Sequence, residues 1–288
     1  MIGFIILQYN LDEKTIKAVD SIKKMTELPY KIIIVDNCST NNAYLAVKNL
    51  YTNSDNIITL RTETNLGFAN GNNFGVKYAL ENFNFEYICV LNNDIYVNSK
   101  IDDRTIEDWK ELNFDVMGPD IFRKDISEHQ NPLANVNYSL FWLYSFYLIY
   151  NVYRLLNLLH LDEILHHMAI WTLERLNKNK NKLIEVDETQ VVKKLHGSFL
   201  VFSQSFLKKF PTPFYPTTFM YLEEDFLALR CERSNSKVIY YPHLKVDHDH
   251  GSTVTTITSN NHNKRKYIFK HNSDSFKALI KYYKSNEL

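Results

Sequence analysis

The sequence predicts an α/β protein with a mostly parallel, Rossmann-like central sheet that is flanked by helices. In the first hundred residues, short apolar runs alternate with segments of helical periodicity. Strands separated by helices of about ten to fifteen residues are typical of βαβ units and a parallel sheet. Each apolar run also ends in a polar cluster, as expected where parallel strands carry their carboxyl ends to one ligand-binding edge.

The elements of this first part follow from the periodicity. The predicted strands cover residues 2–7, 31–35, 56–60 and 87–91. The predicted helices cover residues 12–25 and 42–50, and a third runs to about residue 80 after a loop at 65–71. Because parallel crossovers are right-handed, the ends of these strands should lie on one side of the sheet.

Beyond residue 98 the alternation is less regular. The pattern predicts strands at 116–122 and 237–241, an extended run at 191–202, and helices at 221–230 and 265–283. Residues 246–252 are predicted to form a loop rich in His and Asp. Residues 138–161 form a long apolar and aromatic segment in which Arg154 is the one formal charge.

Composition narrows the class of protein. Lys and Arg total 33, as do Asp and Glu, so the net charge of zero argues against a dedicated nucleic-acid binder. Cys38, Cys89 and Cys231 are odd in number and far apart, which favours a reducing compartment. The N-terminal residues lack a basic region and a cleavage site, so they are predicted to form the first strand and no signal peptide.

Four polar clusters are predicted to meet at one edge of the sheet. In chain order they are Tyr9-Asn10; Asp36, Asn37 and Ser39; the loop 65–71; and Asn92-Asn93-Asp94. Asp94 at a strand end could supply an oxygen ligand to a hard divalent cation that bridges a diphosphate. Asp36 could accept hydrogen bonds from a nucleobase or ribose. The glycines at 65–71 could let backbone amides approach a phosphate at a helix start. Ordinary turn chemistry is the alternative for each cluster taken singly.

Two further groups carry candidate chemistry. Glu223, Glu224 and Asp225 open a predicted helix, and one of them could act as a general base towards a hydroxyl. The helix dipole, which favours acids in a first turn, is the alternative explanation. His248 and His250 alternate along an extended segment, so they could face the same way and bind a metal. A hard cation shared with a diphosphate fits this pattern better than zinc does.

Taken together, the motifs resemble those of family 2 nucleotide-sugar glycosyltransferases of the bacterial polysaccharide type, including rhamnosyltransferases. The matching stretches are FIILQYN, IIIVDNCSTN, ETNLGFANGNNFG, VLNND, HGSFLVF, FMYLEEDFLALR and VDHDHGST, and they span most of residues 1–255 in the family's order. The resemblance implies a GT-A fold, a nucleoside-diphosphate sugar donor, Mg²⁺ or Mn²⁺, and an inverting displacement.

The resemblance also implies residue roles on the donor side. Asp36 would hold the nucleobase or ribose, with Tyr9, Asn10, Asn37 and Ser39 nearby. The donor pocket would be lined by Asn65, Gly67 and Asn73. Asp94 would be the metal-binding acid of an Asp-X-Asp motif in which Asn92 replaces the first Asp and Asn93 stands between them.

On the acceptor side, His196 and Gly197 would border the sugar and the acceptor. Glu224 would take the base position, with Asp225 as the competing candidate and Glu223 as the other acid of the triplet. His248 would reach the metal or the diphosphate, with His250 as the alternative. Lys270, His271 and Asn272 stand where the family has an Arg-Asn pair.

The implied organisation is a glycosyltransferase domain at 1–255 and a helical tail at 256–288. Residues 1–98 would bind the nucleotide sugar, and residues 99–255, with an apolar helical insertion at 138–176, would bind the acceptor. The implied reaction moves a sugar from a UDP- or dTDP-sugar to a glycan or lipid-linked acceptor in bacterial cell-surface polysaccharide synthesis. The alternative is a catalytically silent nucleotide-sugar-binding or peripheral membrane module of the same fold.

The apolar segment 138–161 is long enough to cross a bilayer, but a crossing here would separate Asp94 from Glu224. It is therefore predicted to be a buried helix or an interfacial one, with Arg154 and Asn157 able to face water. The basic connector at 177–182 could add attraction to anionic lipid. These features predict a cytoplasmic protein at the inner face of the bacterial plasma membrane.

Overall fold

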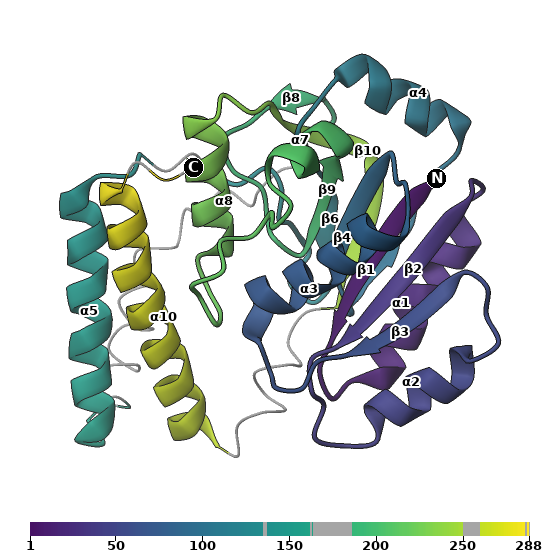
Figure 1. Ribbon diagram of the computed structural model, residues 1–288. Coiled ribbons are helices and arrows are strands. Elements are labelled where there is room, and N and C mark those ends of the chain that lie inside the picture. Colours follow the sequence, from purple (N-terminus) through teal and green to yellow (C-terminus); the bar gives the residue numbers. More distant parts are fainter. Residues whose placement is uncertain (135–136, 162, 164–185, 250–259, 286, 288) are drawn as a thin grey trace.

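The computed structural model describes residues 1–134, 137–161, 163, 186–249, 260–285 and 287. In this part of the chain, ten strands form one mixed sheet with helices on both faces (Figure 1). The strand order is β3-β2-β1-β4-β9-β6-β10-β5, with β7 paired to β6 and β8 paired to β10. The predicted α/β class with a mostly parallel sheet is confirmed.

The first half of the sheet is parallel, as the alternating pattern predicts. Its strands are β1 (Ile2–Gln8), β2 (Tyr30–Asp36), β3 (Ile57–Arg61) and β4 (Tyr87–Asn92). Its helices are α1 (Asp12–Met25), α2 (Ala43–Tyr51) and α3 (Gly67–Asn82). The third helix begins earlier than predicted: Gly67 is its first residue, and Gly71, which was expected in the preceding loop, lies within it.

The second half of the sheet mixes strand directions. Its strands are β5 (Ile95–Val97), β6 (Val116–Arg123), β7 (Glu128–His129), β8 (Gln190–Val191), β9 (Phe199–Ser203) and β10 (Val238–His248). Strand β9 runs antiparallel between β4 and β6, and β10 runs parallel to β6 and antiparallel to β5. The predicted run at 191–202 is extended only near its ends, and β10 continues into the predicted loop as far as His248.

The remaining helices are α4 (Asp103–Leu112), α5 (Leu140–Leu158), α7 (Gln204–Lys209), α8 (Glu223–Arg233) and α10 (Asn261–Lys284). They complete the layers on the two faces of the sheet and add a group at one end, formed by α5, α8 and α10. One face of the sheet is covered by α1, α2 and α4 through buried residues that include Val19, Val47 and Trp109. The other face is covered by α3, α7 and α8 through Val76, Phe206 and Leu227, among others.

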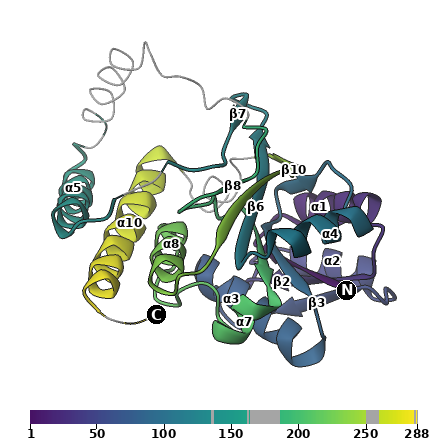
Figure 2. The same cartoon turned by 90° about the horizontal axis from the view of Figure 1, so that it is seen from above.

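Helices α5 and α10 lie side by side at one end of the molecule, with α8 between them and the sheet (Figures 1 and 2). Their shared core includes Leu143 of α5, Phe226 of α8 and Leu279 of α10. Phe146 and Tyr150 of α5 stack on Phe276 of α10 at ring-centroid distances of 5.5 and 5.6 Å. Among the described residues, no helix has both the length and the apolarity needed to cross a bilayer.

Candidate active site

A cavity of about 470 Å³ lies where the parallel strands end, and each of the four predicted strand-end clusters contributes to its wall. The contributing residues are Tyr9, Asn37, Asn65, Gly67, Asn92, Asn93 and Asp94. Further predicted residues line the same cavity, namely His196, Gly197, Glu223, Glu224 and His248. Side chains from both halves of the chain therefore surround one hollow.

Asp94 and His248 meet because β5 and β10 pair antiparallel directly beside them, with Ile95 opposite His248. The backbone N–H of Asp249 donates to the carbonyl of Asp94 (2.9 Å), which holds the two strand ends together. The Nε2 atom of His248 then lies 3.4 Å from Oδ1 of Asp94, and both residues are buried. That Asp94 oxygen finds no hydrogen-bond donor among the described residues.

This pair fits a hard divalent cation. A buried carboxylate oxygen without a donor, next to an imidazole nitrogen, is a set of atoms that a cation could satisfy. The described residues contain no cluster of three or more His, Cys, Asp or Glu side chains that could hold a metal. A cation here would therefore need oxygen atoms from a ligand or water, which is how Mg²⁺ is commonly held in sites that bind phosphates. His250, the alternative ligand, lies outside the described residues.

Gln130 joins the two histidines of the cavity wall, and the sequence pattern did not identify it. Its Oε1 lies 2.5 Å from Nδ1 of His248, and its Nε2 lies 3.3 Å from Nε2 of His196. The two rings are 5.8 Å apart. Because Gln130 directly follows the short strand β7, only the pairing of β7 with β6 places it here, and that pairing leaves no periodic signal in the sequence.

The three acids of α8 point to different surroundings. Glu224 is half-buried in the cavity, and its Oε1 accepts a hydrogen bond from the Gly197 N–H (3.3 Å). A Cβ atom on Gly197 would lie 3.2 Å from Cγ of Glu224, so a glycine at 197 lets the helix approach this closely. Asp225 turns away from the cavity and accepts hydrogen bonds from Nζ of Lys194 (2.7 Å) and the hydroxyl of Tyr138 (2.5 Å).

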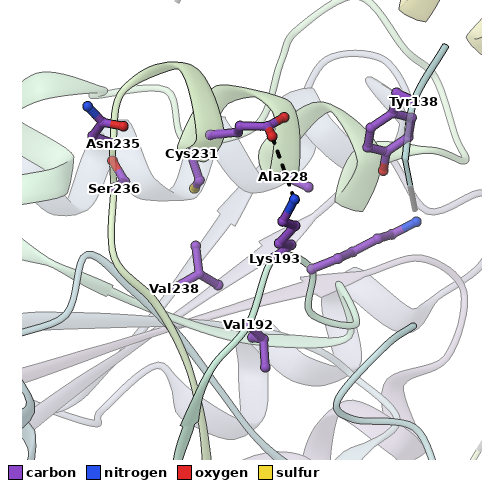
Figure 3. A pocket seen from close by; sticks show the side chains of 10 residues that line it. Tyr138, Val192, Lys193, Ala228, Cys231, Asn235, Ser236 and Val238 are labelled. Carbon is purple, nitrogen blue, oxygen red and sulfur yellow. Dashed lines mark ion pairs between the residues drawn. The ribbon is translucent and has the colours of Figure 1, made fainter. Parts of the chain in front are cut away.

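Lys194 and Tyr138 border a second pocket of about 320 Å³, on another side of α8 (Figure 3). The ion pair of Lys193 with Glu232, 3.9 Å long, also belongs to this pocket and is dashed in the figure. Asp225, the competing candidate for the base, does not line the larger cavity.

Glu223 lines the cavity but is buried, and its Oε1 has no hydrogen-bond partner among the described residues. Burial, with a smaller contribution from the charge of Glu224, raises the pKa of Glu223 to about 8. Glu223 therefore carries a proton at neutral pH and can donate a hydrogen bond into the cavity. Of the three acids, Glu224 is the one that is both partly exposed and part of the cavity wall.

The turn that leads into α8 is strained. Tyr221 and Leu222 have φ angles of 77° and 67°. Residues other than glycine rarely adopt this region of backbone conformation. Both residues line the cavity. Backbone strain of this kind costs on the order of 1–3 kcal/mol per residue and occurs preferentially at functional sites.

Four predicted residues hold loops and do not line the cavity. The Asp36 carboxylate is fully buried and accepts hydrogen bonds from Nε2 of Gln8 (3.0 Å) and from the N–H (2.9 Å) and hydroxyl (2.5 Å) of Ser39. Asn10 accepts from the Thr40 N–H (2.8 Å), which joins the turns after β1 and β2. The cavity wall contains none of these four predicted residues, namely Asn10, Asp36, Ser39 and Asn73.

The predicted phosphate loop at 65–71 is used for packing. The Phe68 N–H at the start of α3 donates to the Phe219 carbonyl (2.8 Å), and Gly67 has φ 76° with Phe219 directly against it. Gly71 faces the Leu7 side chain on the sheet. Asn37 and Asn65 line the cavity beside this loop and share a hydrogen bond of 3.0 Å. The Asn37 amide also holds the loop, because it donates to the Gly67 carbonyl (3.0 Å) and accepts from the Leu66 N–H (2.9 Å).

Helix α10 also lines the cavity, through Lys264, Tyr267 and Ile268. These residues belong to the segment that the sequence pattern treated as a tail. The aromatic and basic character of that helix was visible in the sequence, but its position beside Glu223 and Glu224 depends on packing against α5 and α8.

Comparison with known proteins agrees with this architecture. Residues 4–209, more than half of the chain, match the family model of glycosyl transferase family 2, and the chain belongs to this family. Over 139 residues it is 27% identical to the low-salt glycan biosynthesis hexosyltransferase Agl10 of Haloferax volcanii, which covers 46% of this chain and 40% of that protein.

Two solved structures share the fold. GalNAc-T7 with UDP, GalNAc and Mn²⁺ has a TM-score of 0.57 and 12% identity, covering 86% of this chain and 43% of that one. TarS 1–349 of S. aureus in complex with UDP-GlcNAc has a TM-score of 0.51 and 16% identity, covering 87% and 59%. The chain thus has the GT-A fold of these glycosyltransferases but spans less than two thirds of the length of either structure or of Agl10.

Proposed function

We propose that this protein is an inverting glycosyltransferase that moves a sugar from a nucleoside-diphosphate sugar, of the UDP or dTDP type, to a hydroxyl group. The observation that carries the proposal is the shared cavity of Asp94, His248 and Glu224. A buried acid beside an imidazole suits a cation-bound diphosphate, and a half-buried carboxylate in the same cavity suits a general base.

The donor occupies the side of the cavity formed by the strand ends. Tyr9, Asn37 and Asn65 line this side. Tyr9 offers a ring and Asn65 an amide group to the nucleoside, while the Asn37 amide holds the loop at 65–67. Asp36, Ser39 and Asn10 act indirectly by holding the turn that carries Asn37. Asp94 and His248 would hold Mg²⁺ or Mn²⁺, which when bound would offset the negative charge of the diphosphate.

The acceptor enters beside Glu224. The Glu224 carboxylate takes the proton of the acceptor hydroxyl, whose oxygen forms a bond to the anomeric carbon. The bond from that carbon to the diphosphate oxygen breaks on the opposite side, and its electron pair leaves with the nucleoside diphosphate. The configuration at the anomeric carbon is therefore inverted, and Gly197 keeps Glu224 in position through its N–H.

The acceptor is a glycan or a lipid-linked precursor, of the kind used for cell-surface polysaccharides. We infer that residues 138–161 contact a membrane surface on its cytoplasmic side, which would bring a lipid-linked acceptor to the enzyme. The partial exposure of α5 supports this inference, because apolar residues such as Leu148 (64% exposed) face away from the protein.

The test replaces Glu224 by Gln, which keeps the shape of the side chain and removes the base. We expect turnover to fall by about 10²-fold or more while nucleotide-sugar binding persists. Sugar transfer or donor hydrolysis reports turnover, and a thermal-shift screen of nucleoside diphosphates and their sugars, with and without Mg²⁺ or Mn²⁺, reports binding. Glu232→Gln, at an exposed position of the same helix, serves as the matched control.

Unchanged turnover in Glu224→Gln would remove Glu224 from the base position. Donor binding without any transfer or hydrolysis in the unsubstituted protein, across acceptors, would instead favour the silent nucleotide-sugar-binding module. The two results are separable because binding and turnover are measured on the same samples.

A further inference from the structure

Helix α5 has an apolar outer stripe that stays exposed beside the other helices that the structure describes. The stripe consists of residues at helical spacing along one face, namely Phe141, Tyr144, Leu148, Val152, Leu155 and Leu158. Phe141 is 83% exposed and Leu158 is 72% exposed. An apolar stripe of this length on a surface helix indicates an interaction site.

The opposite face of the same helix packs against the neighbouring described helices. Leu143 is fully buried, and Phe146 and Tyr150 stack on Phe276 of α10. Figure 2 shows α5 at the edge of the molecule, with α10 between it and α8. The outer stripe thus faces away from α8 and the sheet, and it carries no acidic residue.

Helix α10 presents an exposed basic stripe next to this apolar one. Lys266, Lys270, Lys277, Lys281 and Lys284 are all exposed and repeat at helical spacing. The helix contains seven Lys and Arg residues against one acid, Asp274, although the chain as a whole has no net charge. The positive charge is therefore concentrated on this side of the molecule.

Direct contacts show that the two stripes adjoin. Nζ of Lys284 lies 2.7 Å from the hydroxyl of Tyr144 and 5.0 Å from the centre of its ring. Further along the pair, Nη1 of Arg154 lies 3.6 Å from Oδ1 of Asp274. A basic stripe thus borders an apolar and aromatic one along two antiparallel-packed helices, a combination that matches the charge and polarity of an anionic bilayer surface.

We propose that the outer stripe of α5 and the lysine stripe of α10 together form a docking surface for an anionic lipid bilayer. The apolar and tyrosine side chains of α5 would enter the headgroup region, and the lysines would meet lipid phosphates. Because Lys264, Tyr267 and Ile268 of the same α10 line the cavity, docking places the cavity close to the bilayer. The docking surface deepens the proposed function and rests on it, because a lipid-linked acceptor would lie at the bilayer.

The experiment measures co-sedimentation of the full chain with vesicles. One set is pure phosphatidylcholine, and in the other about a third of the lipid is phosphatidylglycerol. The unsubstituted protein should bind the anionic vesicles and bind the neutral ones far more weakly. Two variants remove one stripe each: Leu148→Glu with Leu155→Glu, and Lys270→Gln with Lys277→Gln and Lys281→Gln. Each should weaken anionic binding by at least about tenfold.

Matched controls lie on the other side of the molecule. Leu45→Glu with Leu50→Glu changes two leucines of α2 that are 51% and 56% exposed, and Lys17→Gln with Lys23→Gln and Lys24→Gln changes three exposed lysines of α1. Both controls should bind vesicles like the unsubstituted protein. Melting temperature and nucleotide-sugar binding, measured on the same samples, show whether each variant is folded and whether the proposed function holds independently of docking.

Several results would overturn the proposal. They are equal binding to neutral and anionic vesicles, no binding at all, and equal losses in the control variants. A lipid-independent dimer that the leucine variant converts to a monomer would show that a second copy covers the stripe. A lower melting temperature in that variant, without a change in vesicle binding, would show that the chain covers its own stripe.

Discussion

At the scale of single residues, Glu224 and Asp225 show how neighbours in the chain can serve different purposes. Glu224 faces the cavity and touches the Gly197 N–H, whereas Asp225 is buried between Lys194 and Tyr138. Burial raises the pKa of Asp225 and the Lys194 charge opposes that rise. Asp225 thus connects α8 to the segment that carries Gly197, and it positions Glu224 without touching the cavity.

This assignment predicts a specific effect of Asp225→Asn. Removing one partner of a buried ion pair leaves Lys194, whose side chain is only 14% exposed, without its counter-charge. We expect the free energy of unfolding to fall by about 3 kcal/mol, while turnover falls much less than in Glu224→Gln. Urea unfolding and a transfer assay on the same variant would measure the two effects.

The rescue experiment separates positioning from catalysis. A double variant, Asp225→Leu with Lys194→Met, removes both charges and should recover stability relative to Asp225→Asn, because an apolar pair often replaces a buried ion pair without loss. A stable Asp225→Asn variant that is as inactive as Glu224→Gln, and that still binds the nucleotide sugar, would instead make Asp225 the base.

The sequence pattern located the candidate site well but could not separate residues that face a ligand from residues that hold a loop. Asp36 and Asn37 are adjacent polar residues at the end of one strand, yet only Asn37 lines the cavity. Asn73 accepts from and donates to the backbone of Phe214, at 3.1 and 2.7 Å. Whether a polar side chain lines the cavity or holds a loop depends on which distant residues the fold brings next to it. The residue type alone does not determine this.

At the scale of elements, the start of α3 illustrates a close approach that only glycine allows. Gly67 has φ 76°, and a Cβ atom there would lie 2.2 Å from the carbonyl oxygen of Phe219. Gly67→Ala should therefore lower the free energy of unfolding by roughly 2–4 kcal/mol, and it should displace the turn at 219–222 that borders the cavity. Chemical unfolding and the affinity for a nucleotide sugar would measure both effects.

Gly118→Ala is the control for this prediction. Its Cβ atom would meet the ends of the Leu195 and Asn131 side chains, at 2.8 and 3.0 Å, and side chains can shift where a backbone carbonyl cannot. A loss in Gly67→Ala no larger than in Gly118→Ala would show that the contact with Phe219 is not as rigid as argued.

The elements themselves were predictable where periodicity was regular. All four strands and three helices of residues 1–92 appear where apolar alternation placed them, with ends shifted by a few residues. The insertion of β9 between β4 and β6 was not predictable, because strand order depends on long-range pairing and each strand alone reads as an apolar run. For the same reason, the helix at 261–284 was expected as a tail and is in fact part of the cavity wall.

At the scale of the whole molecule, a net charge of zero conceals a strong separation of charge. Acids gather at the cavity, which is lined by Asp94, Glu223 and Glu224, and lysines gather on the exposed side of α10. The acids at the cavity repel one another, and burial adds to that cost. The fold accommodates this by keeping Glu223 protonated, so the stability of the whole molecule is linked to pH.

That linkage gives a prediction with a definite sign. Glu223 has a pKa of about 8 in the folded protein, compared with an ordinary value of 4.5, because of burial and the nearby charges of Glu224 and Asp225. Between these two values the folded state holds a proton that the unfolded chain has lost, so the free energy of unfolding falls as pH rises and levels off above about pH 8. Over about pH 5.5 to 8 the decrease from this one group should be on the order of 3 kcal/mol.

Glu223→Gln, which cannot ionise, should lose this part of the slope and should be more stable than the unsubstituted protein at pH 8. Urea unfolding at several pH values measures the slope, with Glu232→Gln as a control that should keep it, and identical slopes for Glu223→Gln and the unsubstituted protein would show that Glu223 is already ionised at neutral pH.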